Sequence, residues 1–262
     1  MTRQEKFDHF KNLHQKGNPI MLYNIWSAGS AKAAVNAGAS IVATGSKPLA
    51  LSQGYPDGEV IPFDTFLQTI EQIVSHVNVP VSVDFESGYA GNDDELLAIN
   101  TEKLLQTGII GLNFEDKIIG ANGLYSIEKQ SKRIKIIREV ADDLGVPLFI
   151  NARTDIFFEE KDTSKYYKLM PEAIARAKAY TNAGADGFFT PGLVDLDLIK
   201  KLTSTLNIPL NIVKLPTAPI NEALINAGVQ RISYGPFAYI NLMKVFSDNL
   251  TKNCVEEKVH IN

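Results

Sequence analysis

The sequence has a single cysteine and no hydrophobic run long enough to cross a membrane. Cys254 lies in a charged tail, residues 251–262, so an internal disulfide is excluded and a nucleophile in the core is disfavoured. A membrane-spanning helix needs about 20 consecutive apolar residues. The first residues, MTRQEKFDHF, also lack the hydrophobic stretch of a signal peptide. These absences predict a cytoplasmic protein with no membrane partner.

Positive charge and histidine are also scarce. The 26 Lys and Arg residues are outnumbered by 30 Asp and Glu, which gives a formal net charge of −4. This balance disfavours nucleic acid as a partner and favours a small molecule. The four histidines fall on predicted helices or in the tail, so a histidine general base is not supported: His9, His14, His76 and His260.

Short β-rich apolar runs alternate with longer amphipathic stretches along the whole chain. Such alternation is typical of repeated βα units around a parallel sheet. The predicted strands are residues 20–25, 40–44, 81–85, 109–114, 147–152, 186–190, 209–213 and 230–234. Eight strands predict an α/β fold of the (β/α)8 TIM-barrel type, which takes about 250 residues. No linker divides the chain, so we expect one domain over residues 1–262, with its core at about 18–250.

Two further helices flank the repeated units. An extra helix at about residues 4–15 precedes the first strand and would either cap the bottom of the barrel or meet another subunit. The last helix, about residues 237–250, is apolar enough to pack on its own barrel or on a neighbour's. Glycines that follow predicted helices are expected in the left-handed conformation that ends a helix: Gly38, Gly108, Gly145, Gly184 and Gly228.

Acidic residues gather at the predicted ends of neighbouring strands. Asp84 and Glu86 follow the third strand and Glu115 ends the fourth, while Arg153 ends the fifth. The carboxyl ends of the strands meet at one mouth of such a barrel. Close carboxylates repel unless a cation lies among them, and oxygen ligands without His or Cys favour Mg²⁺ or Mn²⁺. The alternative is that these charges only pair with one another or solvate loop ends.

Other residues at this mouth suit an anionic ligand. Gly45 and Ser46 are small, so their main-chain N–H groups could approach a ligand oxygen. Asp57, in the next loop, could hold a metal-bound water or orient that loop. The forked guanidinium of Arg153 suits a carboxylate or a phosphate-like group.

Five motifs together resemble the isocitrate lyase and phosphoenolpyruvate mutase superfamily. They are YNIWSAGSA at 23–31, GYPDG at 54–58, DFESGY at 84–89, NFED at 113–116 and NARTD at 151–155. The resemblance spans about residues 18–245. It implies a (β/α)8 barrel whose last helix is exchanged between the subunits of a homodimer or homotetramer.

The resemblance also implies a chemistry and a set of site residues. It implies that Mg²⁺ is bound by Asp84, Glu86 and Glu115, and that a C–C or P–C bond next to a 2-oxo acid is made or broken through a metal-stabilised enolate. It implies substrate binding by Trp26, Gly45, Ser46 and Arg153. It implies catalytic roles for Arg153, Glu115, Asp57 and Asn122.

The loop after the fourth strand departs from the pattern of the lyases in this superfamily. Those lyases carry a Lys-Lys-Cys-Gly-His type loop, whereas residues 116–126 hold neither cysteine nor histidine. The phosphonate branch has a lysine and an asparagine there. Asn122 matches the asparagine with a shift of one residue, but Gly120 or Ala121 stands at the lysine position. The loop's glycines fit either a mobile lid or tight turns.

Three hypotheses follow for the function. The first is a lyase that cleaves or forms a C–C bond next to a small 2-oxo or 2-hydroxy acid. The second is P–C bond rearrangement or hydrolysis with a phosphonate substrate. The third is a barrel that binds a 2-oxo acid without turning it over.

Overall fold

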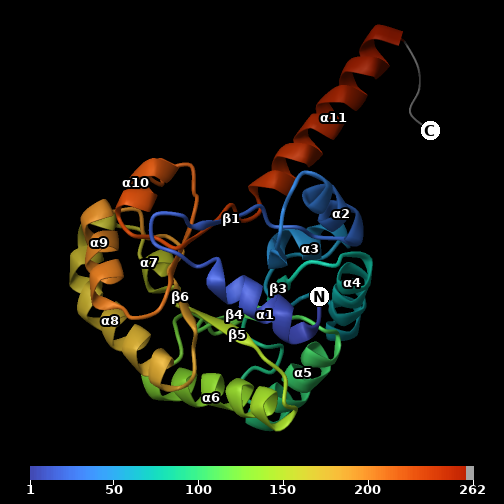
Figure 1. The fold of residues 1–262 in the computed structure, drawn as a ribbon. Helices are drawn as coiled ribbons and strands as arrows, with labels where there is room; N and C mark the ends of the chain where they lie inside the picture. Colours follow the sequence, from blue (N-terminus) through green and yellow to red (C-terminus); the bar gives the residue numbers. More distant parts are fainter. Residues whose placement is uncertain (258–262) are drawn as a thin grey trace.

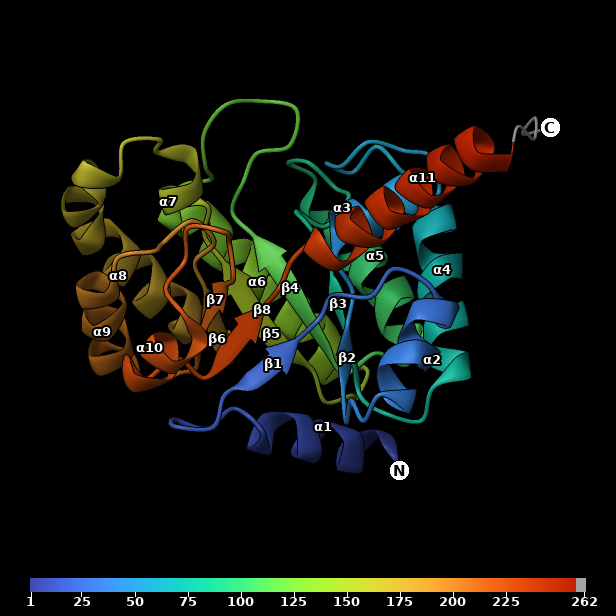
Figure 2. The ribbon, with the colours of Figure 1, turned by 90° about the horizontal axis from the view of Figure 1, so that it is seen from above.

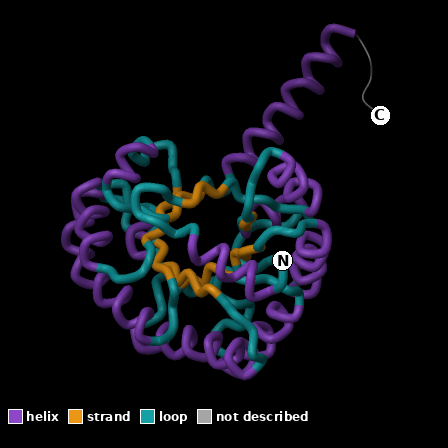
Figure 3. Tube along the Cα trace, in the orientation of Figure 1, coloured by secondary structure: helices purple, strands orange, loops and turns teal. Residues whose placement is uncertain are grey.

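Figure 1 shows the computed structural model, which describes residues 1–257. Eight parallel strands form one sheet in the order β1-β8-β7-β6-β5-β4-β3-β2, and Figure 3 shows the resulting ring of strands inside a ring of helices. Every predicted strand is confirmed within a few residues: β1 (Ile20–Leu22), β2 (Val42–Ala43), β3 (Val81–Asp84), β4 (Gly111–Glu115), β5 (Phe149–Arg153), β6 (Gly187–Phe189), β7 (Leu210–Val213) and β8 (Arg231–Ser233).

The seam between β1 and β2 is closed just beyond the two strands. The Ile25 N–H donates to the Ala43 carbonyl at 2.8 Å, and the Gly45 N–H donates to the Ile25 carbonyl at 3.1 Å. Asn24 adds a side-chain link, because its Nδ2 donates to the Thr44 carbonyl at 2.8 Å. The predicted (β/α)8 barrel is therefore confirmed, with hydrogen bonds linking neighbours around the whole ring.

Amphipathic helices cover the outside of the ring. The helices are α1 (Arg3–Asn12), α2 (Ala28–Asn36), α3 (Ser46–Ser52), α4 (Phe63–His76), α5 (Asp94–Gln106), α6 (Ile127–Asp143), α7 (Ile156–Glu159), a 3-10 turn η1 (Thr163–Lys165), α8 (Tyr166–Asn182), α9 (Leu196–Thr205), α10 (Asn221–Asn226) and α11 (Phe237–Glu257). In α4, for example, Phe66, Ile70 and Ile73 lie three or four residues apart and are fully buried against the sheet. The five glycines expected after helices all have positive φ, from 63° at Gly145 to 109° at Gly184.

Helix α1 closes the bottom of the barrel. Phe10 is completely buried and contacts Phe149 of β5 edge-on, with 5.2 Å between the ring centroids. His14 stacks on the same Phe149 ring at 4.6 Å, and burial together with the charge of Arg231 lowers the pKa of His14 to about 3. Of the two predicted roles for this helix, the structure shows the cap. Figure 2 places it at the end of the barrel opposite the loop that follows β4.

Helix α11 contacts the barrel only through its first turn and then extends away from it. Figure 1 shows it extending away from the ring of helices, and it continues through residues 251–257, which the sequence suggests as tail. Leu242, Val245 and Phe246 are each more than half exposed. The side chain of Cys254 and residues 258–262, including His260, lie outside the described part. Within residues 1–257, no helix is long and apolar enough to cross a membrane.

Candidate active site

A cavity of about 360 Å³ opens at the carboxyl ends of the strands. Its polar wall comes from the elements β1 to β5 and carries Asn24, Ser46, Lys47, Asp57, Asp84, Asn113 and Arg153. Its apolar wall comes from α7, β6, β7 and α11 and carries Phe158, Phe189, Pro191, Val213, Leu215 and Ile240. The cavity thus has one face that can hold charge and one face that excludes water.

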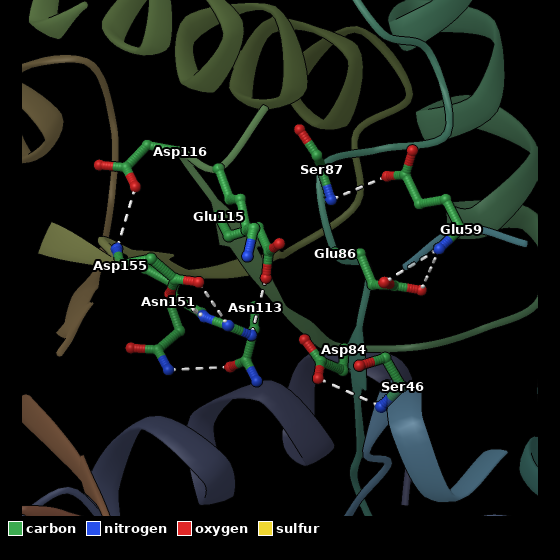
Figure 4. A network of polar contacts seen from close by, with 12 residues as sticks. Ser46, Glu59, Asp84, Glu86, Ser87, Asn113, Glu115, Asp116, Asn151 and Asp155 are labelled. Atoms are coloured by element: carbon green, nitrogen blue, oxygen red, sulfur yellow. Dashed lines mark hydrogen bonds and ion pairs between the residues drawn. The ribbon is translucent and has the colours of Figure 1, made fainter. Parts of the chain in front are cut away.

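Asp84 contributes a buried carboxylate with one free oxygen. Its Oδ2 accepts a hydrogen bond from the Ser46 N–H at 3.2 Å, as Figure 4 shows. Its Oδ1 is buried and has no hydrogen-bond partner. The main chain of Asp84 is held by Thr44, whose Oγ1 accepts from the Asp84 N–H at 2.9 Å. A buried acceptor without a partner is costly, so this oxygen is available to a cation or a ligand.

Glu86 lies in a loop that is locked by Glu59 and Tyr89. The Glu59 N–H donates to both carboxylate oxygens of Glu86, at 3.1 and 3.2 Å, and Figure 4 shows these contacts. In return, Glu59 Oε1 accepts from the Ser87 and Tyr89 N–H groups at 2.9 Å each. Glu59, Glu86 and Tyr89 all have positive φ, between 49° and 57°. This conformation costs about 1–3 kcal/mol per residue and persists only where surrounding contacts impose it.

Arg153 is clamped by two carboxylates. Its Nη1 lies 2.7 Å from Glu115 Oε2, while its Nε and Nη2 donate to the two oxygens of Asp155 at 2.6 and 2.8 Å. Asp155 is held in turn by Asp116, which accepts from the Asp155 N–H at 3.0 Å, and Asp116 is paired with Arg176 of α8. The guanidinium is therefore fixed in the cavity wall before any ligand arrives.

The site holds more carboxyl groups than Arg153 can pair with as ionised carboxylates. Burial, followed by the charges of Asp84, Asp57 and Glu59, raises the pKa of Glu86 to about 8. Burial also raises the pKa of Glu115 well above its usual range, although Arg153 opposes that shift. In both groups the folded environment disfavours the ionised form unless a positive charge is added.

Gly45, Ser46 and Asp57 line the cavity as predicted, but not all in the expected way. The N–H groups of Gly45 and Ser46 are already used by Ile25 and Asp84, so they are not free donors for a ligand. A Cβ on Gly45 would lie 2.9 Å from Pro48, so packing requires glycine there. The pKa of Asp57 is raised by burial and by the charge of Asp84, and the Ser46 side chain opposes that shift.

Four predicted site residues are absent from the cavity lining: Trp26, Glu86, Glu115 and Asn122. Trp26 contacts Tyr239 of α11 edge-on at 5.2 Å and is absent from the lining residues. Asn122 is exposed in the loop of residues 116–126, which stands out from the barrel mouth in Figure 2. Gly120 and Gly123 of this loop have φ of 76° and 93°, so both serve tight turns.

Sequence reasoning assigned no role to four residues that shape this site. Glu59 and Asp155 position Glu86 and Arg153, as described above. Asn24 joins β1, β2 and the loop after β8, because its Oδ1 accepts from the Gly235 N–H at 2.8 Å. Asn113 lines the cavity from β4. Asn24, Asn113 and Asp155 stand inside the recognised motifs, so a polar residue near the carboxyl end of a strand was the available signal.

The arrangement suits one metal ion held mainly by Asp84. Among residues 1–257, no three His, Cys, Asp or Glu side chains converge as a common ligand set, because Glu86 faces Glu59 and Glu115 faces Arg153. The expectation that Asp84, Glu86 and Glu115 all bind the ion directly stays a prediction. Mg²⁺ usually keeps several waters and takes only one or two carboxylates, so the free Oδ1 of Asp84 and the carboxyl groups beside it, whose ionised forms an added cation would favour, fit Mg²⁺.

The sequence profile of the phosphoenolpyruvate phosphomutase family matches residues 10–253. An uncharacterized protein of Mycobacterium tuberculosis is 30% identical over 232 residues, which is 88% of this chain and 83% of that protein. The 2-methylisocitrate lyase of Halalkalibacterium halodurans is 26% identical over 244 residues, which is 89% of this chain and 77% of that enzyme. The crystal structure of a Burkholderia cenocepacia protein, suggested to be a phosphonomutase, superposes with a TM-score of 0.89 at 40% identity. The superposition covers 94% of this chain and 99% of that protein.

Proposed function

The chain belongs to the phosphoenolpyruvate phosphomutase family, and on this premise we propose that it is a Mg²⁺-dependent lyase. The enzyme would cleave the C–C bond next to the oxo group of a small 2-oxo acid, or next to the hydroxyl group of a small 2-hydroxy acid. One observation carries the proposal: the free Asp84 Oδ1 and the fixed guanidinium of Arg153 line one cavity. Asp84 would hold the ion. Glu86 and Glu115 lie close enough together for their charges to interact.

The chain's own residues would divide the work as follows. Arg153 binds and orients the substrate carboxylate through a guanidinium that Glu115 and Asp155 already fix. The apolar wall, from Phe158 to Ile240, excludes water and strengthens electrostatic interactions at the polar wall. When bound, Mg²⁺ stabilises the negative charge that develops on the oxo oxygen as the bond breaks.

The charges around the cavity favour a carboxylate substrate over a phosphonate. Among the described lining residues only Lys47 and Arg153 are cationic, and the fork of Arg153 is shared by Glu115 and Asp155. A phosphonate group adds up to two negative charges that these residues would have to balance. A carboxylic acid that is cleaved at a C–C bond and carries a compact apolar substituent fits the apolar wall of the cavity better than a phosphonate does.

P–C bond rearrangement or hydrolysis is the second candidate function. It is favoured by the 40% identity to the Burkholderia cenocepacia protein suggested to be a phosphonomutase. Asn122, the residue that would match the phosphonate branch, is exposed on its loop and lies outside the cavity lining.

Turnover assays with Mg²⁺ test the proposal directly. The purified protein would be incubated with oxaloacetate, 2-methylisocitrate, 2,3-dimethylmalate and phosphonopyruvate, and products would be followed by mass spectrometry and phosphorus NMR. We expect C–C cleavage of at least one carboxylic acid, lost in EDTA and restored by Mg²⁺. Cleavage of phosphonopyruvate alone would favour the second candidate, whereas ligand-dependent melting shifts without any product would favour a binding protein.

We also propose that α11 packs on a second copy of the chain in a homodimer or homotetramer. Its exposed Leu242, Val245 and Phe246 form an apolar surface on the part of the helix that extends away from the barrel, beyond the contacts of Tyr239 and Ile240. Light scattering of the wild type is expected to give the mass of a dimer or tetramer, and Phe246→Asp is expected to lower it. Lys244→Ala, on the same helix but paired with Asp248, is the control. A monomeric wild type would refute the proposal.

A further inference from the structure

The floor of the cavity is formed by an asparagine whose side-chain oxygen is fully engaged. Asn113 Oδ1 accepts a hydrogen bond from Asn151 Nδ2 at 2.9 Å and another from Arg231 Nη2 at 3.2 Å. Figure 4 shows the amides of Asn113 and Asn151 facing one another beside Asp84. The three strands that carry Asp84, Asn113 and Asn151 place these residues in the same register, so their side chains point to the same face, the barrel interior.

These contacts determine which end of the Asn113 amide faces the ligand. Arginine has donors only, so a flipped amide would set its NH₂ group against the guanidinium of Arg231. Oδ1 must therefore point to Arg231 and Asn151, which directs Nδ2 elsewhere. No hydrogen bond among the described residues uses Asn113 Nδ2, and Asn113 lines the cavity.

Arg231 is a buried arginine with unpaired hydrogen-bond donors. It is 1% exposed, yet its Nε and Nη1 have no hydrogen-bond partner. Burying a cation without a paired anion lowers the stability of the folded state, and such unfavourable arrangements are typical of functional sites. The guanidinium of Arg231 lies between Asn113, to which it donates, and the ring of Phe10 at 5.8 Å, on the helix that closes the bottom of the barrel.

We propose that Asn113 Nδ2 donates a hydrogen bond to a carboxylate or oxo oxygen of the bound substrate, and that Arg231 is a positioning residue that holds the amide in this orientation. The inference rests on the proposed function, because it takes the ligand to be a small oxo acid. It adds a neutral donor on the cavity floor to Arg153 on the wall. Two donors on different strands would fix the plane of a flat oxo acid, which a single guanidinium leaves free to rotate.

Asn113→Asp separates this role from a purely structural one. The aspartate would form an ion pair with Arg231, so the melting temperature is expected to hold or rise. The same change replaces the donor by a carboxylate oxygen, which repels an anion. With oxalate and Mg²⁺ as the probe, because oxalate is a flat dicarboxylate like an enolised oxo acid, calorimetry is expected to show affinity weakened about 100-fold. Asn113→Ala, which also lacks the donor but adds no charge, should weaken it about 10-fold.

Asn211→Asp is the matched control. Asn211 also faces the barrel interior, on β7 beside Arg231 in register, but it does not line the cavity. The variant adds the same charge close to Arg231 without touching the ligand, so oxalate affinity is expected to stay within about threefold. If Asn113→Asp and Asn211→Asp weakened oxalate binding equally, the proposed hydrogen bond from Asn113 to the ligand would be contradicted.

Arg231→Met tests the positioning role through its coupling to Asn113. If Arg231 acts by holding the amide, Arg231→Met should weaken oxalate binding about 10-fold in the wild type and about twofold or less in Asn113→Ala. Equal effects in both backgrounds would show that Arg231 does not act through Asn113. A wild-type protein that binds neither oxalate nor pyruvate with Mg²⁺ would instead overturn the proposed function, and this inference with it.

Discussion

Replacing Arg153 with lysine is expected to lower kcat/KM for the C–C substrate by about 100- to 1000-fold. Lysine keeps the positive charge between Glu115 and Asp155 but has no rigid fork, so it cannot hold both carboxylates and orient a substrate carboxylate at once. The loss should fall on kcat as well as on KM, since a misplaced substrate reacts slowly even when bound.

The structure offers a matched control for this substitution. Arg138 of α6 also bridges two acceptors, the Gly184 carbonyl at 3.0 Å and Asp186 at 2.6 Å, but it lies on the outer layer, away from the cavity. Arg138→Lys is expected to retain activity within about twofold while lowering stability by about 1 kcal/mol. If Arg153→Lys matched Arg138→Lys in steady-state kinetics and in melting temperature, Arg153 would have only a structural role.

Asp84→Asn is expected to remove the response to Mg²⁺. The asparagine can still accept the Ser46 N–H through its oxygen, but it lacks the negative charge that the proposed metal site needs. Since a bound cation supplies several kcal/mol of charge stabilisation, turnover should fall about 1000-fold or more. We also expect Mg²⁺ to raise the melting temperature of the wild type but not that of Asp84→Asn.

Stability without Mg²⁺ gives this prediction a second, separate readout. The charge of Asp84 repels Glu86 but attracts the buried Arg153 and Arg231, so these effects oppose one another and the metal-free melting temperature is expected to change little. Asp195→Asn, at the N-cap of α9 where asparagine caps equally well, is the control. An Asp84→Asn protein that still needs Mg²⁺ for full turnover would contradict the assignment of Asp84 to the ion.

Much of the fold could be predicted from local patterns. Each strand is a short apolar run bounded by turn residues, and Gly184 follows its helix in the left-handed conformation that only glycine adopts without cost. The strand count then determines the barrel, because eight βα units close on themselves. Barrel closure in turn predicts that Asp84, Glu115 and Arg153 share one mouth, as observed.

Side-chain partners could not be predicted in the same way. The spacing of Asp84 and Glu86 predicts one shared direction, but the positive φ of Glu86 turns its carboxylate toward Glu59, a loop residue 27 positions earlier in the chain. Trp26 lies in a recognised motif, yet it packs on Tyr239 because α11 passes beside it. Such contacts depend on how loops from distant segments meet after the barrel has formed.

The sequence by itself determined the βα alternation, the strand ends and the residue types at the mouth, because these follow from periodicity and covalent order. Only the tertiary structure decided that Glu115 pairs with Arg153, that Asn113 turns its oxygen down to Arg231, and that α11 leaves its own barrel. The reason is physical. A hydrogen bond is chosen among all groups brought within about 3 Å, and in a closed barrel those groups come from strands far apart in the chain.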